Sequence, residues 1–149
     1  MKPGTAGWVR VLLLAGLLAC SRATPRNHRD TSSLPRDEHA SLSAGFVTGD
    51  TAAVQRLLDP QFVVQPPAPD SALAGGPAIT YLLGLVNASD LSGSWLEPTT
   101  MHREGSFLLE QGVWRLRSGN REVRTRYVLR WRPSQRGWKV VLWRWGRFQ

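Results

Sequence analysis

A carboxylate and a guanidinium lie on two predicted strands near the end of the chain, among residues that a strand would turn inward. Glu110 belongs to the alternating series Leu108, Glu110, Gly112, Trp114 and Leu116. The last predicted strand has a similar series: Trp138, Val140, Leu142 and Arg144. Alternate residues of a strand share a face, and a carboxylate is costly to bury unpaired. The spacing predicts that Glu110 and Arg144 pair at the rim of an apolar pocket; the alternatives are a structural ion pair or a bulge that turns either residue outward.

Three aromatic residues are candidate walls of this pocket: Tyr81, Trp95 and Tyr127. Apolar walls with a few polar groups are typical of sites for small molecules. The predicted ligand is a small, partly apolar molecule with an anionic or hydroxyl group.

The histidines form no catalytic or metal-binding pattern. We interpret each of the three, His28, His39 and His102, as a solvated surface residue. They lack Cys or Asp at ligand spacing, and the chain has no Ser-His-Asp arrangement, phosphate loop or nucleotide fingerprint. We therefore predict no metal, no cofactor and no catalytic residue, and we favour a protein that is not an enzyme.

Arginine dominates the C-terminal third of the chain. Residues 101–149 hold twelve Lys and Arg against three Glu, and the whole chain has a formal net charge of +8. In the third long strand, residues of the core type alternate with Arg124, Arg126, Arg130 and Arg132. The opposite face is therefore predicted to be basic, suited to an anionic surface or to a homodimer partner. If the last two strands pair so that their core-facing residues lie opposite one another, Trp143 and Trp145 are placed on this basic face. A slip of one residue in this register would reverse the assignment.

The order of elements predicts an α+β fold. Capping and stop signals indicate a helix from Ser33-Leu34-Pro35 to Gly49, a second helix over 51–58 and a third that opens at 75–77, with a short strand at 62–64 before it. From residue 92 the apolar period changes to two and turn signals recur, which predicts four antiparallel strands over about 93–102, 106–117, 121–132 and 137–148. Helices followed by strands imply a curled antiparallel sheet wrapped around three helices.

The N-terminal region predicts export. Lys2 and Arg10 precede an apolar run at 11–19 that is too short to span a bilayer, so residues 1–19 are interpreted as a signal peptide. Leu17-Leu18-Ala19-Cys20 resembles the lipobox of bacterial lipoproteins, which implies a lipid on Cys20; an ordinary secretory signal is the alternative. Residues 20–33 are predicted to be a flexible tether and 34–149 a single domain. The expected location is the bacterial cell envelope, on the outer-membrane or periplasmic side, which makes nucleic acid an improbable partner.

Several short motifs of the body resemble one superfamily. They are Gly49-Asp50, Leu57-Leu58-Asp59-Pro60, Gly76-Pro77-Ala78-Ile79, Glu110-Gln111-Gly112 with Trp114, Tyr127-Val128-Leu129-Arg130-Trp131 and Gly137-Trp138-Lys139-Val140-Val141. In order and spacing the chain is similar to the nuclear transport factor 2 (NTF2)-like superfamily, in particular its SnoaL-like branch and a related bacterial family known only as a domain of unknown function. The resemblance implies a cone-like sheet around helices, a pocket at its wide end and often a dimer on the outer sheet face.

Members of that superfamily include isomerases, dehydratases and cyclases as well as binding modules without catalysis, and fold alone does not choose among them. The ketosteroid isomerases of this fold combine an early-strand carboxylate base with a tyrosine and an acid. Here 62–65 has no carboxylate and 38–48 no tyrosine. Three hypotheses follow, in order: a small-ligand binding or sensing module, an interaction protein whose basic sheet face meets anionic envelope components or a protein, and a SnoaL-like isomerase or cyclase.

Overall fold

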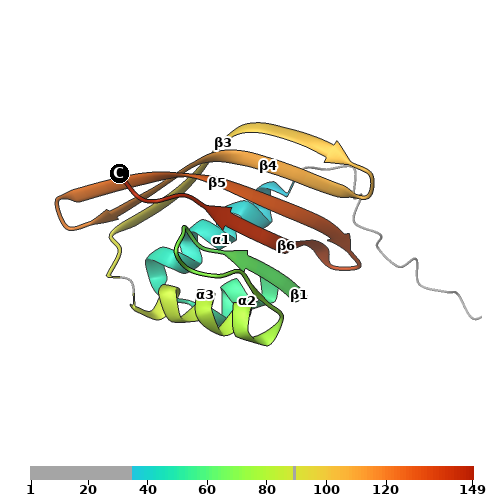
Figure 1. The fold of residues 1–149 in the computed structure, drawn as a ribbon, viewed down its shortest axis with the longest axis horizontal. Coiled ribbons are helices and arrows are strands. Elements are labelled where there is room, and N and C mark those ends of the chain that lie inside the picture. The colour runs from blue at the N-terminus through green and yellow to red at the C-terminus, as the bar shows by residue number, and fades with distance from the viewer. Residues whose placement is uncertain (1–34, 89) are drawn as a thin grey trace, which may run out of the picture.

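The computed structural model describes residues 35–88 and 90–149. In chain order the elements are α1 (Arg36–Thr48), α2 (Thr51–Leu57), β1 (Leu58–Gln65), β2 (Leu73–Ala74), α3 (Gly76–Ala88), β3 (Gly93–Glu104), β4 (Phe107–Ser118), β5 (Arg121–Ser134) and β6 (Gly137–Trp145) (Figure 1). None of the helices in these two ranges has the length and hydropathy of a membrane span. The signal peptide and the tether lie outside the described residues, so both stay predictions.

Local signals start and stop the first two helices. Asp37 and Glu38 lie in the first turn of α1, where their negative charge stabilises the helix by interacting with the positive end of its dipole. Gly49 ends α1 with φ 68°, a left-handed conformation that glycine adopts without strain. Asp50 then caps α2, because its side chain accepts a hydrogen bond of 2.8 Å from the amide of Ala53.

The six strands form one mixed sheet in the order β2-β1-β6-β5-β4-β3. β1 pairs in parallel with β6, and every other neighbouring pair is antiparallel. The four predicted long strands are present, each within a few residues of its expected bounds. β2 was not predicted, because a pair of residues is too short to show any periodicity.

The sheet curls over the helices (Figure 1), and the predicted α+β cone is confirmed. The inner sheet face and the helices enclose a core rich in tryptophan. Phe46 of α1 packs edge-on against Trp114 and Trp143, with ring centroids 5.2 and 5.5 Å away. Trp145 adds a third indole, 5.7 Å from Trp114. Aromatic side chains thus fill the middle of the cone.

A bulge in β6 changes which side chains face the core. Arg130 pairs with Leu142 and Trp131 with Val140, so Val141 is the extra residue. The alternation therefore shifts by one position after Val140. Trp143 and Trp145 are 0% and 5% exposed and face the core, so the prediction that they lie on the basic face is wrong.

Candidate functional site

A fully buried carboxylate lies at the centre of a polar cluster inside the cone. Glu110 is 0% exposed, on the inner face of β4. Its Oε1 accepts a short hydrogen bond from the Tyr127 hydroxyl, and its Oε2 accepts one of 2.9 Å from Trp131 Nε1. His39 Nε2 lies 3.0 Å from Oε1, although it is not aligned for a hydrogen bond. Both oxygens are therefore satisfied, and the carboxylate joins α1, β4 and β5.

The strand register brings these groups together. Glu110 is directly opposite Leu129 on β5, so it lies between the inward residues Tyr127 and Trp131 of the same strand. Burial raises the pKa of Tyr127, and the neighbouring Glu110 carboxylate raises it further. The phenol consequently stays protonated and serves as a donor to the carboxylate.

His39 is a site residue that the sequence interpretation missed. Its side chain is only 18% exposed, which contradicts its interpretation as a solvated surface histidine. The available signal was its helical spacing with Leu42 and Phe46, three and seven residues further along α1, which are both buried. That spacing places His39 on the inward stripe, one turn before the helix enters the aromatic core.

A cavity of about 370 Å³ opens between the start of α1 and β3. It combines basic, hydroxyl and apolar groups: Arg36, His39, Thr99, Thr100, Pro35, Pro98 and Met101. His39 lines this cavity and contacts Glu110 behind it, so a buried carboxylate backs an accessible imidazole.

The expected pair of Glu110 and Arg144 does not form. Arg144 is opposite Val128, on the outer face of the sheet, whereas Glu110 faces the core. The bulge at Val141 explains the difference, because it separates Arg144 from the inward series of Trp138 and Val140.

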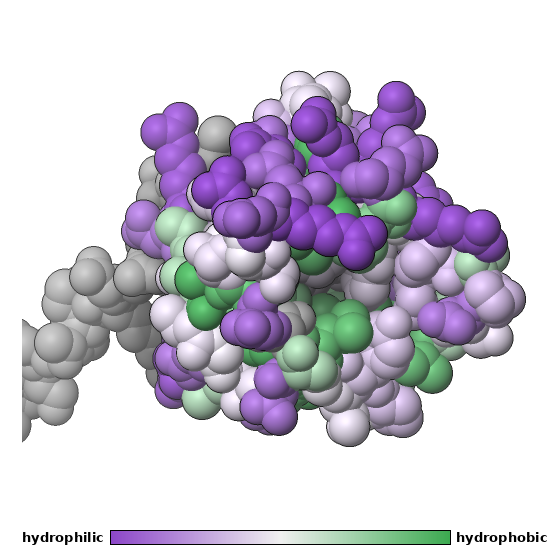
Figure 2. All heavy atoms as spheres, turned by 90° about the vertical axis from the view of Figure 1, so that its left-hand side faces the viewer, coloured by the Kyte–Doolittle hydropathy of each residue, from purple (hydrophilic) through white to green (hydrophobic). Residues whose placement is uncertain are grey.

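The other predicted pocket walls are dispersed. Tyr127 joins the Glu110 cluster, whereas Tyr81 stacks on Trp145, with ring centroids 6.5 Å apart, and lines a second, mainly aromatic cavity of about 320 Å³. Figure 2 shows hydrophobic surface at that end of the molecule, below the hydrophilic sheet side. Trp95 lies on the outer face of β3, 38% exposed, where the guanidiniums of Arg115 and Arg117 stack on its ring.

The four arginines predicted to form the basic surface lie on the outer face of β5, but two of them are neutralised. Arg130 lies 3.8 Å from Glu104, and Arg132 contacts the buried Asp59. Arg124 and Arg126 form no ion pair with any described residue. Across residues 35–88 and 90–149, no group of three or more His, Cys, Asp or Glu could hold a metal ion.

The sequence matches no family model and no curated protein. The structure is similar to three solved bacterial NTF2-like proteins. That of Pseudomonas putida, of unknown function, has a TM-score of 0.61 and 15% identity over 74% of this chain and 82% of that one. The protein from Shewanella oneidensis, also of unknown function, has a TM-score of 0.62 and 10% identity, and the match covers 76% of this chain and 100% of that one. The protein from Novosphingobium aromaticivorans, which has a cystatin-like fold, has a TM-score of 0.60 and 18% identity, and the match covers 74% of this chain and 77% of that one.

The chain has the NTF2-like fold. At these identities the likeness extends to the fold alone, so the use of its cavities is argued from the residues that line them. The cavity between α1 and β3 is lined by His39, whose Nε2 lies 3.0 Å from the buried carboxylate of Glu110.

Proposed function

We propose that this chain is a small-ligand binding or sensing module, anchored in the bacterial envelope by a lipid on Cys20. The observation that carries the ligand proposal is His39, which lines an open cavity while its Nε2 lies 3.0 Å from the buried carboxylate of Glu110. The anchor proposal rests on the lipobox-like Leu17-Leu18-Ala19-Cys20. Ser21 follows Cys20 in place of an aspartate, and this favours the outer-membrane or periplasmic side.

The lining of the cavity defines the class of ligand. Arg36 and His39 supply groups that can carry positive charge, and Thr100 supplies a hydroxyl. Pro98 and Met101 supply apolar surface beside them. This mixture suits a compact organic anion, such as a carboxylate with a short apolar or aromatic body.

The Glu110 cluster favours binding over catalysis. Its carboxylate already accepts hydrogen bonds from Tyr127 and Trp131, so its role is to fix the position of its neighbours. Because His39 Nε2 faces this carboxylate, Nδ1 is the ring nitrogen left for a molecule in the cavity. A SnoaL-like isomerase or cyclase is correspondingly disfavoured, because no second acid or base lines the cavity.

Replacing His39 by asparagine is expected to weaken ligand binding about tenfold to a hundredfold, because a charge-assisted hydrogen bond is lost. The measurement is titration calorimetry with a series of monocarboxylates from acetate to benzoate. His102→Asn is the matched control, since His102 is 52% exposed on β3 and lies outside the cavity. If no carboxylate binds the unaltered protein, or if both variants bind equally well, the proposed ligand site is wrong.

Replacing Cys20 by serine is expected to abolish lipid attachment, because Cys20 is the only cysteine in the sequence. Labelling of expressing bacteria with palmitate, followed by membrane fractionation, measures this directly. Ser21→Ala changes the next residue and should leave labelling intact. An unlabelled wild-type protein in the soluble fraction would instead indicate an ordinary secretory signal.

A further inference from the structure

The outer face of the sheet carries two adjoining hollows of about 560 and 480 Å³. They share Val113, Arg126 and Gly146, so they form one continuous trough across β4, β5 and the end of β6. Four exposed arginines line this basic trough: Arg124, Arg126, Arg144 and Arg147. Its base is apolar where Val113 and Val128 lie.

The acidic residues of the outer face are already engaged, including Glu97, which lies directly opposite Val113 at the edge of the basic trough. Glu97 and Glu122 bind Arg115, and Glu104 lies near Arg130. None of the four trough arginines forms an ion pair with a residue of the described ranges. The Arg147 guanidinium donates a hydrogen bond of 3.3 Å to the carbonyl of Ala68, which leaves its charge uncompensated.

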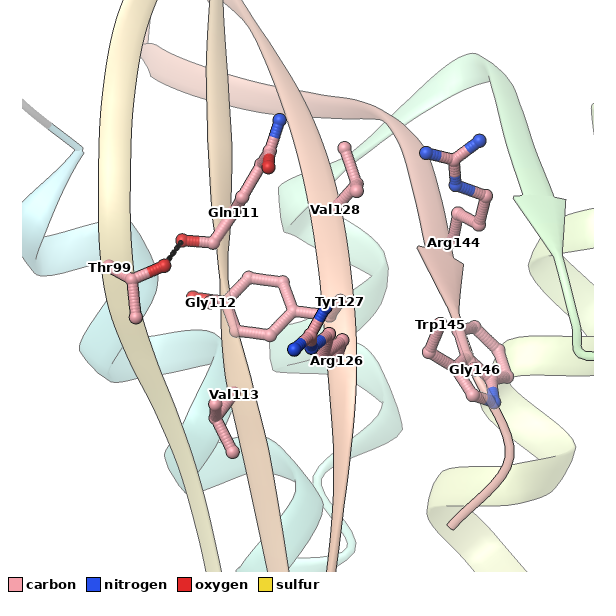
Figure 3. A pocket seen from close by; sticks show the side chains of 10 residues that line it. All are labelled: Thr99, Gln111, Gly112, Val113, Arg126, Tyr127, Val128, Arg144, Trp145 and Gly146. Carbon is pink, nitrogen blue, oxygen red and sulfur yellow. Dashed lines mark hydrogen bonds between the residues drawn. The ribbon is translucent and has the colours of Figure 1, made fainter.

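The strand register sets the spacing of the two central arginines. Arg144 is directly opposite Val128, and Arg126 is two residues before Val128 on the same face (Figure 3). The backbone positions of such diagonal neighbours on adjacent strands lie about 7–8 Å apart. Each guanidinium presents a planar fork that matches a phosphate. The two forks can therefore engage neighbouring phosphate groups.

The form of the trough distinguishes between occupants. It lies on an open sheet face, opposite the core, whereas sites for small molecules enclose most of their ligand. A two-fold symmetric dimer through the basic trough would set arginines against arginines, because the same patch faces itself. Separate charges spread over an open face suit a surface that presents many phosphates.

We propose that the basic trough binds the phosphate groups of an anionic phospholipid surface. The inference does not depend on the small-ligand site, which opens between α1 and β3, or on a lipid at Cys20, because the charges belong to the folded domain itself. A domain anchored through Cys20 would gain a second membrane contact, and two signals together hold a protein on a membrane more firmly than one.

The test is flotation of the full chain with phosphatidylcholine vesicles that contain or lack phosphatidylglycerol. The ratio of the two partition coefficients cancels whatever the apolar N-terminal run contributes. Each arginine near an anionic surface contributes about fivefold, so Arg126→Ser with Arg144→Ser should lower the ratio about thirtyfold. Arg121→Ser with Arg136→Ser removes the same charge from two exposed positions, one beside a turn and one within a turn, and should lower the ratio about threefold or less.

Modification with phenylglyoxal provides a second measurement on the unaltered chain. Anionic vesicles should protect Arg126 and Arg144 and leave Arg121 and Arg136 reactive. If both double variants lose the preference for phosphatidylglycerol vesicles equally, the preference follows from net charge and not from the basic trough. A wild-type ratio of partition coefficients near one would contradict binding to anionic lipid. A dimer that depends on Arg126 and Arg144 and shows no vesicle preference would assign the face to a second copy. Each of these three results overturns the proposal.

Discussion

Replacing Glu110 by leucine is expected to lower the free energy of unfolding by about 3–5 kcal/mol. Leucine fills a similar volume but accepts no hydrogen bond. The Tyr127 hydroxyl and the indole of Trp131 would then lose their acceptor in a fully buried environment, where each unsatisfied group costs about 1–3 kcal/mol. Urea denaturation followed by far-ultraviolet circular dichroism measures the loss.

Two further variants distinguish hydrogen bonding from side-chain volume. Glu110→Gln keeps an acceptor for Trp131, and its amide can donate to the Tyr127 oxygen, so the expected loss is about 1–2 kcal/mol. Glu104→Gln alters an acid that is 44% exposed and should change stability by less than about 0.5 kcal/mol. A leucine variant as stable as the wild type would show that the buried cluster contributes no stability.

Trp114→Ala is expected to cost about 3–5 kcal/mol, because it removes the centre of the aromatic core. The Trp114 ring lies 4.9 Å from Trp143 and 5.7 Å from Trp145, and its Nε1 donates a buried hydrogen bond of 3.1 Å to Ser94. The change leaves a cavity beside Phe46 and exposes the Ser94 hydroxyl to it. Thermal and urea unfolding both report the change.

The matched control is Trp95→Ala on the outer sheet face. Trp95 is 38% exposed, its ring packs over Gly93, and the guanidiniums of Arg115 and Arg117 stack on it, so the expected cost is about 1 kcal/mol or less. Similar losses in the two variants would mean that stability follows aromatic content in general and does not depend on the packed interior of the cone.

The sequence predicted the layers of the fold because their signals are local. Residue types that alternate between two turns define β5, and caps such as Asp50 with stops such as Gly49 define the helices. The inward position of Glu110 followed from the same alternation. Its partners did not, because the contacts of Tyr127 and Trp131 with Glu110 depend on the register between β4 and β5.

The errors in β6 share one physical origin. A bulge inserts a single residue without any distinctive composition, and Val141 is no different in type from Val140. The faces of Trp143, Arg144 and Trp145 were consequently reversed. His39 was missed because it lies in the first turn of α1, where few helical residues precede it to define the inward stripe.

The position of β6 in the sheet has a consequence for how the chain assembles. β6 is the last strand in sequence, yet it lies between β1 and β5 and is the link between the β1–β2 pair and the β3–β5 meander. Val64 pairs with Trp143 across most of the described chain, and contacts so distant in sequence slow folding. The two parts of the sheet therefore remain separate until β6 inserts between them, so this strand completes the core.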